Sequence, residues 1–484
     1  MSMNGMVDGM PDFCGRENQI SALAHSKEPV SLAAGGIDMA QVQSAAAIAL
    51  HMHQPLIPAG NASDLSSASI IGNLEYMYEH VNEGDNHNAA IFQWCYKRMG
   101  DFIPEMVAKG QQPRVMLDYS GTLLFGLAQM GAAEVFDSLR PLASDPRYVP
   151  AVEWLGTAWG HAVAPSTPIQ DFRLHVLAWQ QHFAALFGEK ALARVRGFSP
   201  PEMAIPNHPD TAYAFVRTLL DCGYEWLLVQ EHTVEEMDGQ GLHIKHLPRR
   251  LVCTNSDGES VNITAIIKAQ GSDTKLVGQM QPWYEARGLS RMSMDGREVP
   301  PLVTQVADGE NGGVMMNEFP PKYHEVVSTA SGSSTPLLNA SEYLAYLDSI
   351  GLSRDRLPSI QPIHQHRLWQ RFQPRDGKDK LARMIQTMQQ EDQHFNMEGG
   401  SWTNNISWVQ GYGDLLGPME QLSRLFYEKV LEPGISTTDP RYRQALFYLL
   451  VSQTSCFRYW GSGVWTEYGK EICRRGLEYL RSHF

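Results

Sequence analysis

Cysteine is scarce in this sequence, and its placement excludes two common kinds of covalent or metal support. The 484 residues contain six cysteines, and no two of them form a CxxC pair. Disulfide frameworks and zinc clusters rely on such closely spaced cysteines, so neither is predicted. The first 44 residues also lack a basic segment followed by an apolar run, so no secretory signal is predicted. Reduced thiols and the missing signal favour a cytoplasmic location.

Lysine and arginine are also fewer than aspartate and glutamate. The chain has 39 Lys and Arg against 53 Asp and Glu, which gives a formal net charge of -14. Proteins that follow a phosphate backbone need clustered basic residues, so nucleic acid is not an expected partner. No window holds the roughly 20 apolar residues that a membrane-spanning helix requires, so no membrane is expected as a partner.

Several motifs of common enzyme classes are missing as well. The sequence contains no GxxxxGK[ST] phosphate loop, no GxSxG nucleophile turn and no HExxH zinc motif. Phosphate-loop nucleotide hydrolysis, serine-esterase chemistry and zinc-dependent proteolysis of the HExxH type therefore become poor explanations. This narrows the field to carbohydrate chemistry.

Short apolar runs that end in polar residues recur along the chain. The run at 45–55, AAAIALHMHQP, is the first, and similar runs begin at Arg114, Ala151, Arg194, Tyr224 and Leu302. Amphipathic stretches that end on glycine, at 171–188 and 210–223, lie between them. Strands that alternate with helices predict a parallel sheet, and polar strand ends predict an α/β barrel whose site lies at the carboxyl ends.

Three segments differ in character. Residues 1–44 are rich in Gly, Ser, Met and Asn and show little periodicity, which predicts an N-terminal extension or mobile arm. Residues 45–330 carry the alternation and are predicted to form the catalytic barrel. Residues 331–484 contain amphipathic helical patterns and are predicted to form an α-helical C-terminal domain that contributes to the site.

Two histidines end the first apolar run. His51 and His53 are two residues apart, so on a strand their rings point to the same side and can donate hydrogen bonds into a pocket. Sugar hydroxyls need such partners. A metal-ligand pair and a purely structural pair are the alternative interpretations, and the residues alone leave all three open.

Two carboxylates follow later runs. Glu202 comes after Pro200 and Pro201, which fix the chain just beyond a strand, and this placement suits a nucleophile. Asp308 begins the segment DGENGG, whose glycines free the backbone to bring an acid close to a ligand. A helix-terminal carboxylate and a plain acidic turn are the respective alternatives. Two acids at the ends of different strands are what glycoside hydrolysis uses.

Taken in order, five segments resemble the conserved regions of glycoside hydrolase family 57. They are HMHQP at 51, AVEWLG at 151, FSPPE at 198, ADGEN at 307 and CFRYWG at 456. The resemblance covers roughly residues 45 to 465. It implies a (β/α)7 barrel followed by a helical domain, an α-glucan or oligosaccharide substrate, retention of anomeric configuration, and no metal or organic cofactor.

The resemblance also implies roles for individual residues. Glu202 would be the nucleophile and Asp308 the general acid and base. The sugar would be bound by His51, His53, Glu153, His161 and Trp460. The sequence departs from the family after DGE, where Asn311 stands in place of an aromatic residue, so Glu310 and Glu318 are alternative acids.

The reaction type stays open at this point. Hydrolysis, 4-α-glucanotransfer and branching share the same two carboxylates. Two other functions also remain: a metal-dependent polysaccharide deacetylase that would recruit His51 and His53, and a catalytically silent glucan-binding protein.

Overall fold

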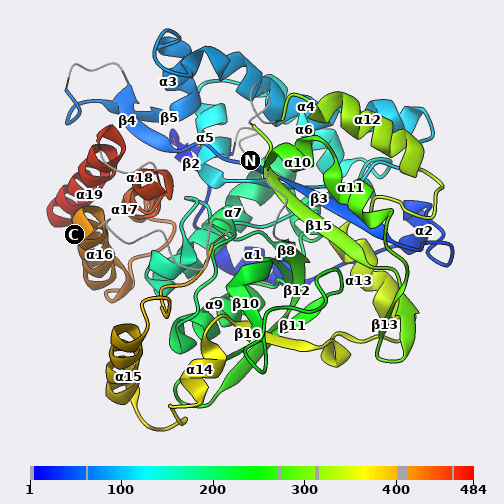
Figure 1. Ribbon diagram of the computed structural model, residues 1–484. Coiled ribbons are helices and arrows are strands. Elements are labelled where there is room, and N and C mark those ends of the chain that lie inside the picture. Colours follow the sequence, from blue (N-terminus) through cyan, green and yellow to red (C-terminus); the bar gives the residue numbers. More distant parts are fainter. Residues whose placement is uncertain (1–4, 61–63, 270–273, 311–315, 402–412, 460–462) are drawn as a thin grey trace.

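The computed structural model describes residues 5–60, 64–269, 274–310, 316–401, 413–459 and 463–484 (Figure 1). Within these ranges, parallel strands surround one inner core. They are β3 (Ala45–Met52), β6 (Val115–Tyr119), β7 (Val152–Trp154), β8 (Gly197–Phe198), β9 (Trp226–Gln230), β12 (Ser260–Lys268) and β15 (Leu302–Asp308). Neighbours in this order pair in parallel, and the bridge between Gly156 and Phe198 joins the β7 segment to β8.

The sheet closes on itself because its last strand returns to its first. Strand β15 pairs in parallel with β3, from Leu302 opposite Ala45 to Asp308 opposite His51. The strands named above thus form a seven-stranded parallel barrel, and the predicted barrel architecture is confirmed.

Alternation along β3 explains how the barrel is filled. Ala45, Ala47 and Ala49 belong to the inner core, whereas Ala46, Ile48 and Leu50 pack under the surrounding helices. Successive strand residues point to opposite faces, so the next inward position after Ala49 is His51. On β15, Val306 is an inner-core residue and Asp308 is the next inward position. The residues at the strand ends are therefore delivered to the carboxyl mouth of the barrel.

Helices connect the strands and cover the barrel. They are α4 (Ala89–Ala108), α5 (Gly121–Gln129), α6 (Ala133–Ser144), α7 (Ile169–Phe187), α8 (Glu189–Leu192), α9 (Pro209–Asp221), α10 (Thr274–Gly278), α11 (Gln281–Ala286), α12 (Phe319–Ala330) and α13 (Ala340–Ser349). The two helices predicted at 171–188 and 210–223 correspond to α7 and α9. Gly188 and Gly223 follow them with positive φ values of 95° and 80°, a conformation that glycine adopts without strain.

The N-terminal segment is folded onto the barrel, so the prediction of a mobile arm is wrong. Strands β1 (Met6–Val7) and β2 (Met10–Pro11) pair, and helix α1 (Glu17–His25) packs against α7. Phe13 and Ile20 are buried in the main core. Helix α2 (Leu32–Gly35) follows, with Ser31 capping its first turn. The apolar residues that anchor this segment are too widely spaced to give a periodic signal.

Further strands extend the sheet from β12. Strand β11 (Arg249–Thr254) is antiparallel to β12, β16 (Ser359–Pro362) is parallel to β11, and β10 (Val234–Glu236) is antiparallel to β16. Two hairpins lie outside this sheet: β4 (Leu56–Gly60) with β5 (Ser69–Gly72), and β13 (Met292–Met294) with β14 (Arg297–Val299). Strand β16 and the inner-core residue Tyr343 of α13 both come after residue 330. The sheet and its core thus continue beyond the boundary that the sequence suggested.

The last part of the chain is helical. It contains α14 (Gln365–Trp369), α15 (Lys378–Glu391), α16 (Gly413–Phe426), α17 (Pro440–Ser452), α18 (Cys456–Tyr459) and α19 (Val464–His483). Helices α16 and α17 pack on α19 beside the barrel (Figure 1), where Gly469 and Gly476 allow leucines of α16 to approach closely. Among the described helices, none has both the length and the apolar character needed to cross a membrane.

Candidate active site

Three imidazole rings lie together at the carboxyl mouth of the barrel. His51 and His53 come from the end of β3, and His161 comes from the loop after β7, where its φ is 55°. The rings of His53 and His161 are stacked with centroids 3.8 Å apart, and those of His51 and His161 are 4.7 Å apart. We call His51, His53 and His161 the histidine stack. The sequence predicted all three as site residues, and the structure brings them together.

Strand β6 supports the histidine stack from one side. Asp118 Oδ1 lies 2.6 Å from His51 Nδ1, and Ser120 Oγ lies 2.8 Å from His53 Nδ1. Asp118 is opposite His51 in the parallel register, so these strands place the two side chains next to each other. The ring orientations on β3 are thus fixed by the neighbouring strand.

The helical part of the chain supports the stack from the other side. Ser455 Oγ lies 2.6 Å from His161 Nδ1, and Cys456 Sγ lies 3.3 Å from His53 Nε2. Arg458, which is fully buried, donates to the backbone oxygen of Gln453 and to Ser166, and so ties this segment to the barrel loop. The C-terminal helices therefore complete the site.

The hydrogen bonds determine how protons are distributed in the stack. Burial lowers the pKa of His51, but the adjacent Asp118 carboxylate outweighs burial and raises that pKa to about 10. His51 is then an imidazolium that donates to Asp118 and, over 2.7 Å, to His161 Nε2. His161 must accept at Nε2, so it is neutral and donates from Nδ1. Burial and the charge of neighbouring histidines lower the pKa of His161 well below its usual range, which agrees with this assignment.

Glu202 lies directly after β8 in a strained turn. Its φ is 57° and that of Met203 is 49°, a left-handed conformation that costs a non-glycine residue on the order of 1 kcal/mol. Pro200 and Pro201 hold the preceding backbone, and Oε1 of Glu202 lies 3.9 Å from His161 Nδ1. Backbone strain of this kind gathers at functional sites, where the position of one side chain matters more than local stability.

Asp308 ends β15 opposite His51. Burial raises the pKa of Asp308, the His51 cation opposes this, and the charge of Asp118 adds to it. Burial and the charge of Asp308 likewise raise the pKa of Glu310. One of these two coupled carboxyl groups thus holds a proton in conditions where an exposed carboxylate would not.

The backbone between these two acids is packed tightly. A side chain at Gly309 would clash with the end of the Met52 side chain, which would have to move. The buried Arg98 of α4 donates from Nη2 to the Gly309 carbonyl oxygen over 2.9 Å. Asp308 is therefore held by its neighbours on both sides.

Comparison with known proteins connects this barrel to glucan enzymes. Neither a protein-family model nor a curated protein matches the sequence. Among solved structures, a 4-α-glucanotransferase from Thermococcus litoralis superposes with a TM-score of 0.54, at 16% identity, over 91% of this chain and 58% of that one. A glycoside hydrolase family 57 branching enzyme from Pyrococcus horikoshii superposes with a TM-score of 0.52, at 13% identity, over 90% of this chain and 88% of that one. This chain has their fold.

The family 57 fold is thus shared, although the lengths differ. The chain spans a little over half of the Thermococcus glucanotransferase, 58%, so that protein's activity does not follow for this chain from the shared fold. The identities of 16% and 13% extend the likeness to the fold alone.

In this family 57 fold, Glu153 does not join the histidine stack. It pairs in register with Met116, two residues before Asp118, and so lies deeper in the barrel. Its Oε2 accepts a hydrogen bond from the backbone of Ser341 over 3.1 Å. The sequence prediction that Glu153 binds substrate beside the histidines thus has no support from this placement. Trp460 lies outside the described residues.

The alternative acids Glu310 and Glu318 and the donor His53 differ in how they lie relative to Asp308 and Glu202. Glu318 directly precedes α12, whereas Glu310 lies two residues after Asp308, whose charge raises the pKa of Glu310. Both ring nitrogens of His53 face protein atoms, those of Ser120 and Cys456, so His53 does not donate to Glu202. His161 is the imidazole near Glu202 instead.

The space beside these groups is small. A hollow of about 10 Å³ is lined by His51, Ser199, Pro200, Glu202, Met203 and Val306. This volume accommodates about one water molecule. A sugar ring is larger than this hollow.

Metal ligation is a further possibility for histidines and carboxylates this close together. Within the described ranges, no group of three or more His, Cys, Asp or Glu has a metal-binding arrangement. Both ring nitrogens of His51 instead contact protein atoms, those of Asp118 and His161. The arrangement seen is that of a hydrogen-bonded stack.

Sequence reasoning missed the residues that hold the stack. Asp118 and Ser120 lie in RVMLDYSG, an apolar run with a polar end like the others, so this pattern contained the signal. Ser455 carries no comparable signal, because it is brought to His161 by a contact across 294 residues. Cys456 begins CFRYWG, the last of the five resembling segments, but its contact with His53 across 403 residues was not predicted.

Proposed function

We propose that this chain is an enzyme of glycoside hydrolase family 57 that acts on α-glucans with retention of configuration. One observation carries the proposal: Glu202 and Asp308 come from the ends of different strands and meet at the same histidine stack. Asp308 is opposite His51, His51 is bonded to His161, and His161 lies 3.9 Å from Glu202. The shared fold with two glucan enzymes supports the same conclusion.

The two acids have different tasks in the proposed mechanism. Glu202 attacks the anomeric carbon and forms a glycosyl-enzyme bond, while Asp308 gives its proton to the leaving glycosidic oxygen. Asp308 then takes a proton from water or from an acceptor hydroxyl, which attacks the same carbon and releases Glu202. In a retaining enzyme the two carboxyl groups are expected about 5 to 5.5 Å apart when substrate is bound.

The protonation states of the groups at the site suit these roles. Burial raises the pKa of Asp308, so part of the population carries the proton that a general acid must donate. His161 Nδ1 lies 3.9 Å from Glu202 Oε1 and donates its N–H to Ser455. The positive charge of His51 lies between Asp118 and Asp308 and keeps these two acids from repelling each other fully.

The acceptor decides which reaction results. Water gives hydrolysis, a sugar hydroxyl gives 4-α-glucanotransfer or branching, and the same two carboxylates serve all three. The first test is therefore the product profile from maltoheptaose for the wild type, Glu202→Gln and the matched control Glu298→Gln. Glu298 is an exposed residue of β14.

We expect the wild type and Glu298→Gln to give the same products and Glu202→Gln to give none. Longer products indicate transfer, and exclusively shorter products indicate hydrolysis. Full activity in Glu202→Gln would refute the assignment of the nucleophile. Binding of maltoheptaose without turnover by the wild type would instead favour the silent binding protein, and deacetylation that depends on a bound divalent metal would favour the deacetylase.

A further inference from the structure

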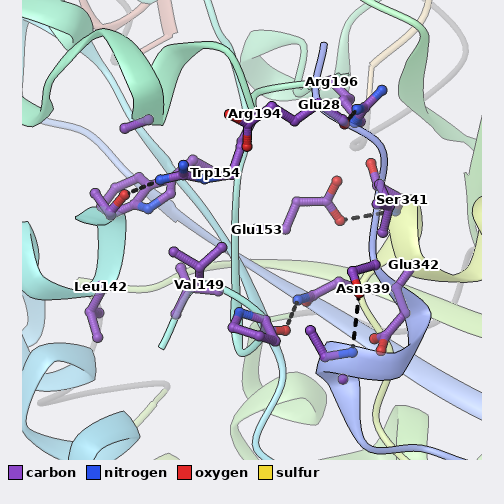
Figure 2. Close-up of a pocket in the computed structure, with 18 of the residues that line it drawn as sticks. Glu28, Leu142, Val149, Glu153, Trp154, Arg194, Arg196, Asn339, Ser341 and Glu342 are labelled. Atoms are coloured by element: carbon purple, nitrogen blue, oxygen red, sulfur yellow. Dashed lines mark hydrogen bonds between the residues drawn. The ribbon is translucent and has the colours of Figure 1, made fainter. Parts of the chain in front are cut away.

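A second cavity lies at the opposite end of the barrel from the histidine stack. Its volume is about 250 Å³ (Figure 2). Val149 and Pro150 precede β7, and Arg194 and Arg196 precede β8, so these lining residues mark the amino ends of the strands. The site described above lies at the carboxyl ends. The two spaces are therefore separate.

The N-terminal segment forms one wall of this cavity. Two buried arginines hold its backbone. The residues of this segment that line the cavity are Glu28, Pro29, Val30, Ser31, Ala34 and Gly35. Arg196 donates to the carbonyl oxygen of Glu28, and Arg114 donates from Nη2 to that of Gly35 over 2.8 Å. A Cβ at Gly35 would lie 2.2 Å from a carboxylate oxygen of Glu342, so the close approach requires glycine. The wall is fixed in place at both ends.

The interior of the cavity offers hydrogen-bond acceptors. Glu153 uses Oε2 for the backbone of Ser341, and among the described residues its buried Oε1 has no partner. Asn339 donates from Nδ2 to Pro150, and its buried Oδ1 likewise has no partner in the described part of the chain. The two residues are 8% and 5% exposed. Buried acceptors of this kind are costly unless a donor reaches them.

The charges around the cavity largely cancel. Arg114 forms a bidentate pair with Glu342, at 2.8 and 2.9 Å, and Arg196 pairs with Glu225 at 2.5 Å. Burial lowers the pKa of the Arg194 guanidinium group, and the negative charge of Glu28 opposes this effect. Figure 2 shows the Glu153 carboxyl pointing toward Ser341, with Arg196 on one side and Asn339 on the other. These acids offset the three arginines and Glu153 adds a further carboxyl group, so an anionic ligand would find no surplus of positive charge.

These features define the chemistry of a ligand. It must donate to Glu153 and Asn339, and hydroxyl groups do so. Its carbon skeleton would contact the apolar wall that includes Leu142, Val152 and Ala191. We propose that this cavity binds a neutral polyhydroxylated molecule of monosaccharide size. The proposal goes beyond the proposed function and does not depend on it.

The test uses D-glucose as the probe, in equilibrium dialysis with the full-length chain. Ala34 is an exposed residue of α2 that lines the cavity, so Ala34→Trp fills the opening from the solvent side. Ala33→Trp is the matched control, because Ala33 is exposed on the same helix and does not line the cavity. Glu202→Gln is measured as well, to separate this cavity from the carboxyl end.

We expect the wild type, Ala33→Trp and Glu202→Gln to bind glucose equally at this cavity. Ala34→Trp should weaken that binding roughly tenfold or more, and Asn339→Ala, which removes one acceptor, should weaken it about threefold. Glucose binding that is identical in wild type and Ala34→Trp would overturn the proposal, and so would no binding to the wild type. Glucose 6-phosphate could also bind more tightly than glucose, with this binding lost in Ala34→Trp. That result would show that the ligand of the cavity is not neutral and would overturn the proposal.

Discussion

The two ends of one barrel differ in what their strands deliver. At the carboxyl end, polar inward residues from several strands meet in a hydrogen-bonded stack with room for about one water molecule. At the amino end, paired charges and apolar side chains surround a cavity of about 250 Å³. Both ends contain a glutamate, the half-buried Glu202 at one and the buried Glu153 at the other. The comparison teaches that the position of an acid along its strand, rather than its residue type, decides which end it serves.

The largest effect should come from removing the proposed general acid. We expect Asp308→Asn to lower the turnover of maltoheptaose by roughly a thousandfold, because the leaving glycosidic oxygen then receives no proton. With maltosyl fluoride, whose leaving group needs little protonation, the loss should be much smaller. Initial rates with the two substrates measure this difference.

Asp379→Asn, an exposed change in α15, is the matched control and should leave both rates unchanged. Equal losses on both substrates in Asp308→Asn would contradict the role of Asp308 as the acid. That outcome would direct attention to Glu310, the other buried acid beside it.

A smaller effect is expected from the residue that orients His51. Asp118→Asn removes the carboxylate that outweighs burial, so the pKa of His51 should fall below its present value of about 10. Turnover should decrease roughly 10- to 100-fold, as is common when the partner of a site histidine is lost. The titration of His51, followed by nuclear magnetic resonance, measures the first change directly.

The same pair makes stability depend on pH. The pKa of His51 is raised on folding, so the pair's contribution is fully present below about pH 6.5 and is lost as pH rises through about 10. The wild type should therefore be destabilised relative to Asp118→Asn as pH rises from 7 to above 10. If the difference in the free energy of unfolding between the two proteins stayed constant across that range, His51 and Asp118 would not form an ion pair.

The smallest effect concerns the amino end. Burial raises the pKa of Glu153 to about 7; the Ser341 hydrogen bond and Arg196 oppose this, whereas Glu342 adds to it. A carboxyl group with a raised pKa contributes stability below its unfolded value near 4.5 and loses it as pH rises toward 7. Glu153→Gln avoids this loss, so it should stabilise the fold by on the order of 2 kcal/mol at pH 8 and by little at pH 4.5.

Urea unfolding at the two pH values measures that change. If Glu153→Gln stabilised the fold equally at both pH values, Glu153 would not titrate between them in the folded chain. Destabilisation at pH 8 would mean that the ionised carboxylate has partners stronger than those seen, which would weaken the contrast between the two ends.

Much of the carboxyl end could be predicted from the sequence because its signal is local. An apolar run that ends in a polar residue predicts a barrel strand and also predicts which residues lie at its carboxyl end. This pattern identified His51, His53 and Asp308. The position of Glu153 could not be judged in the same way. Its run is short, and only the register with β6 shows that Glu153 is level with Met116 rather than with Asp118.

The parts that sequence reasoning missed depend on contacts between distant residues. The wall from Glu28 to Gly35 is held by Arg196 and Arg114, neither of which is near it in sequence. Ser455 is bonded to His161, and β16 joins β11 across more than 100 residues. Local periodicity carries no information about such pairings, so the N-terminal segment was predicted as an extension or mobile arm.

The central claim is that Glu202 forms a covalent bond to the sugar at the carboxyl end of the barrel. The most direct measurement is mass spectrometry of the protein after reaction with a 5-fluoro maltosyl fluoride, which slows release of the intermediate. The account predicts one added 5-fluoromaltosyl group on the peptide that contains Glu202, with fluoride as the leaving group, and products with the anomeric configuration of the substrate. An adduct on another peptide, or products of inverted configuration, would contradict it.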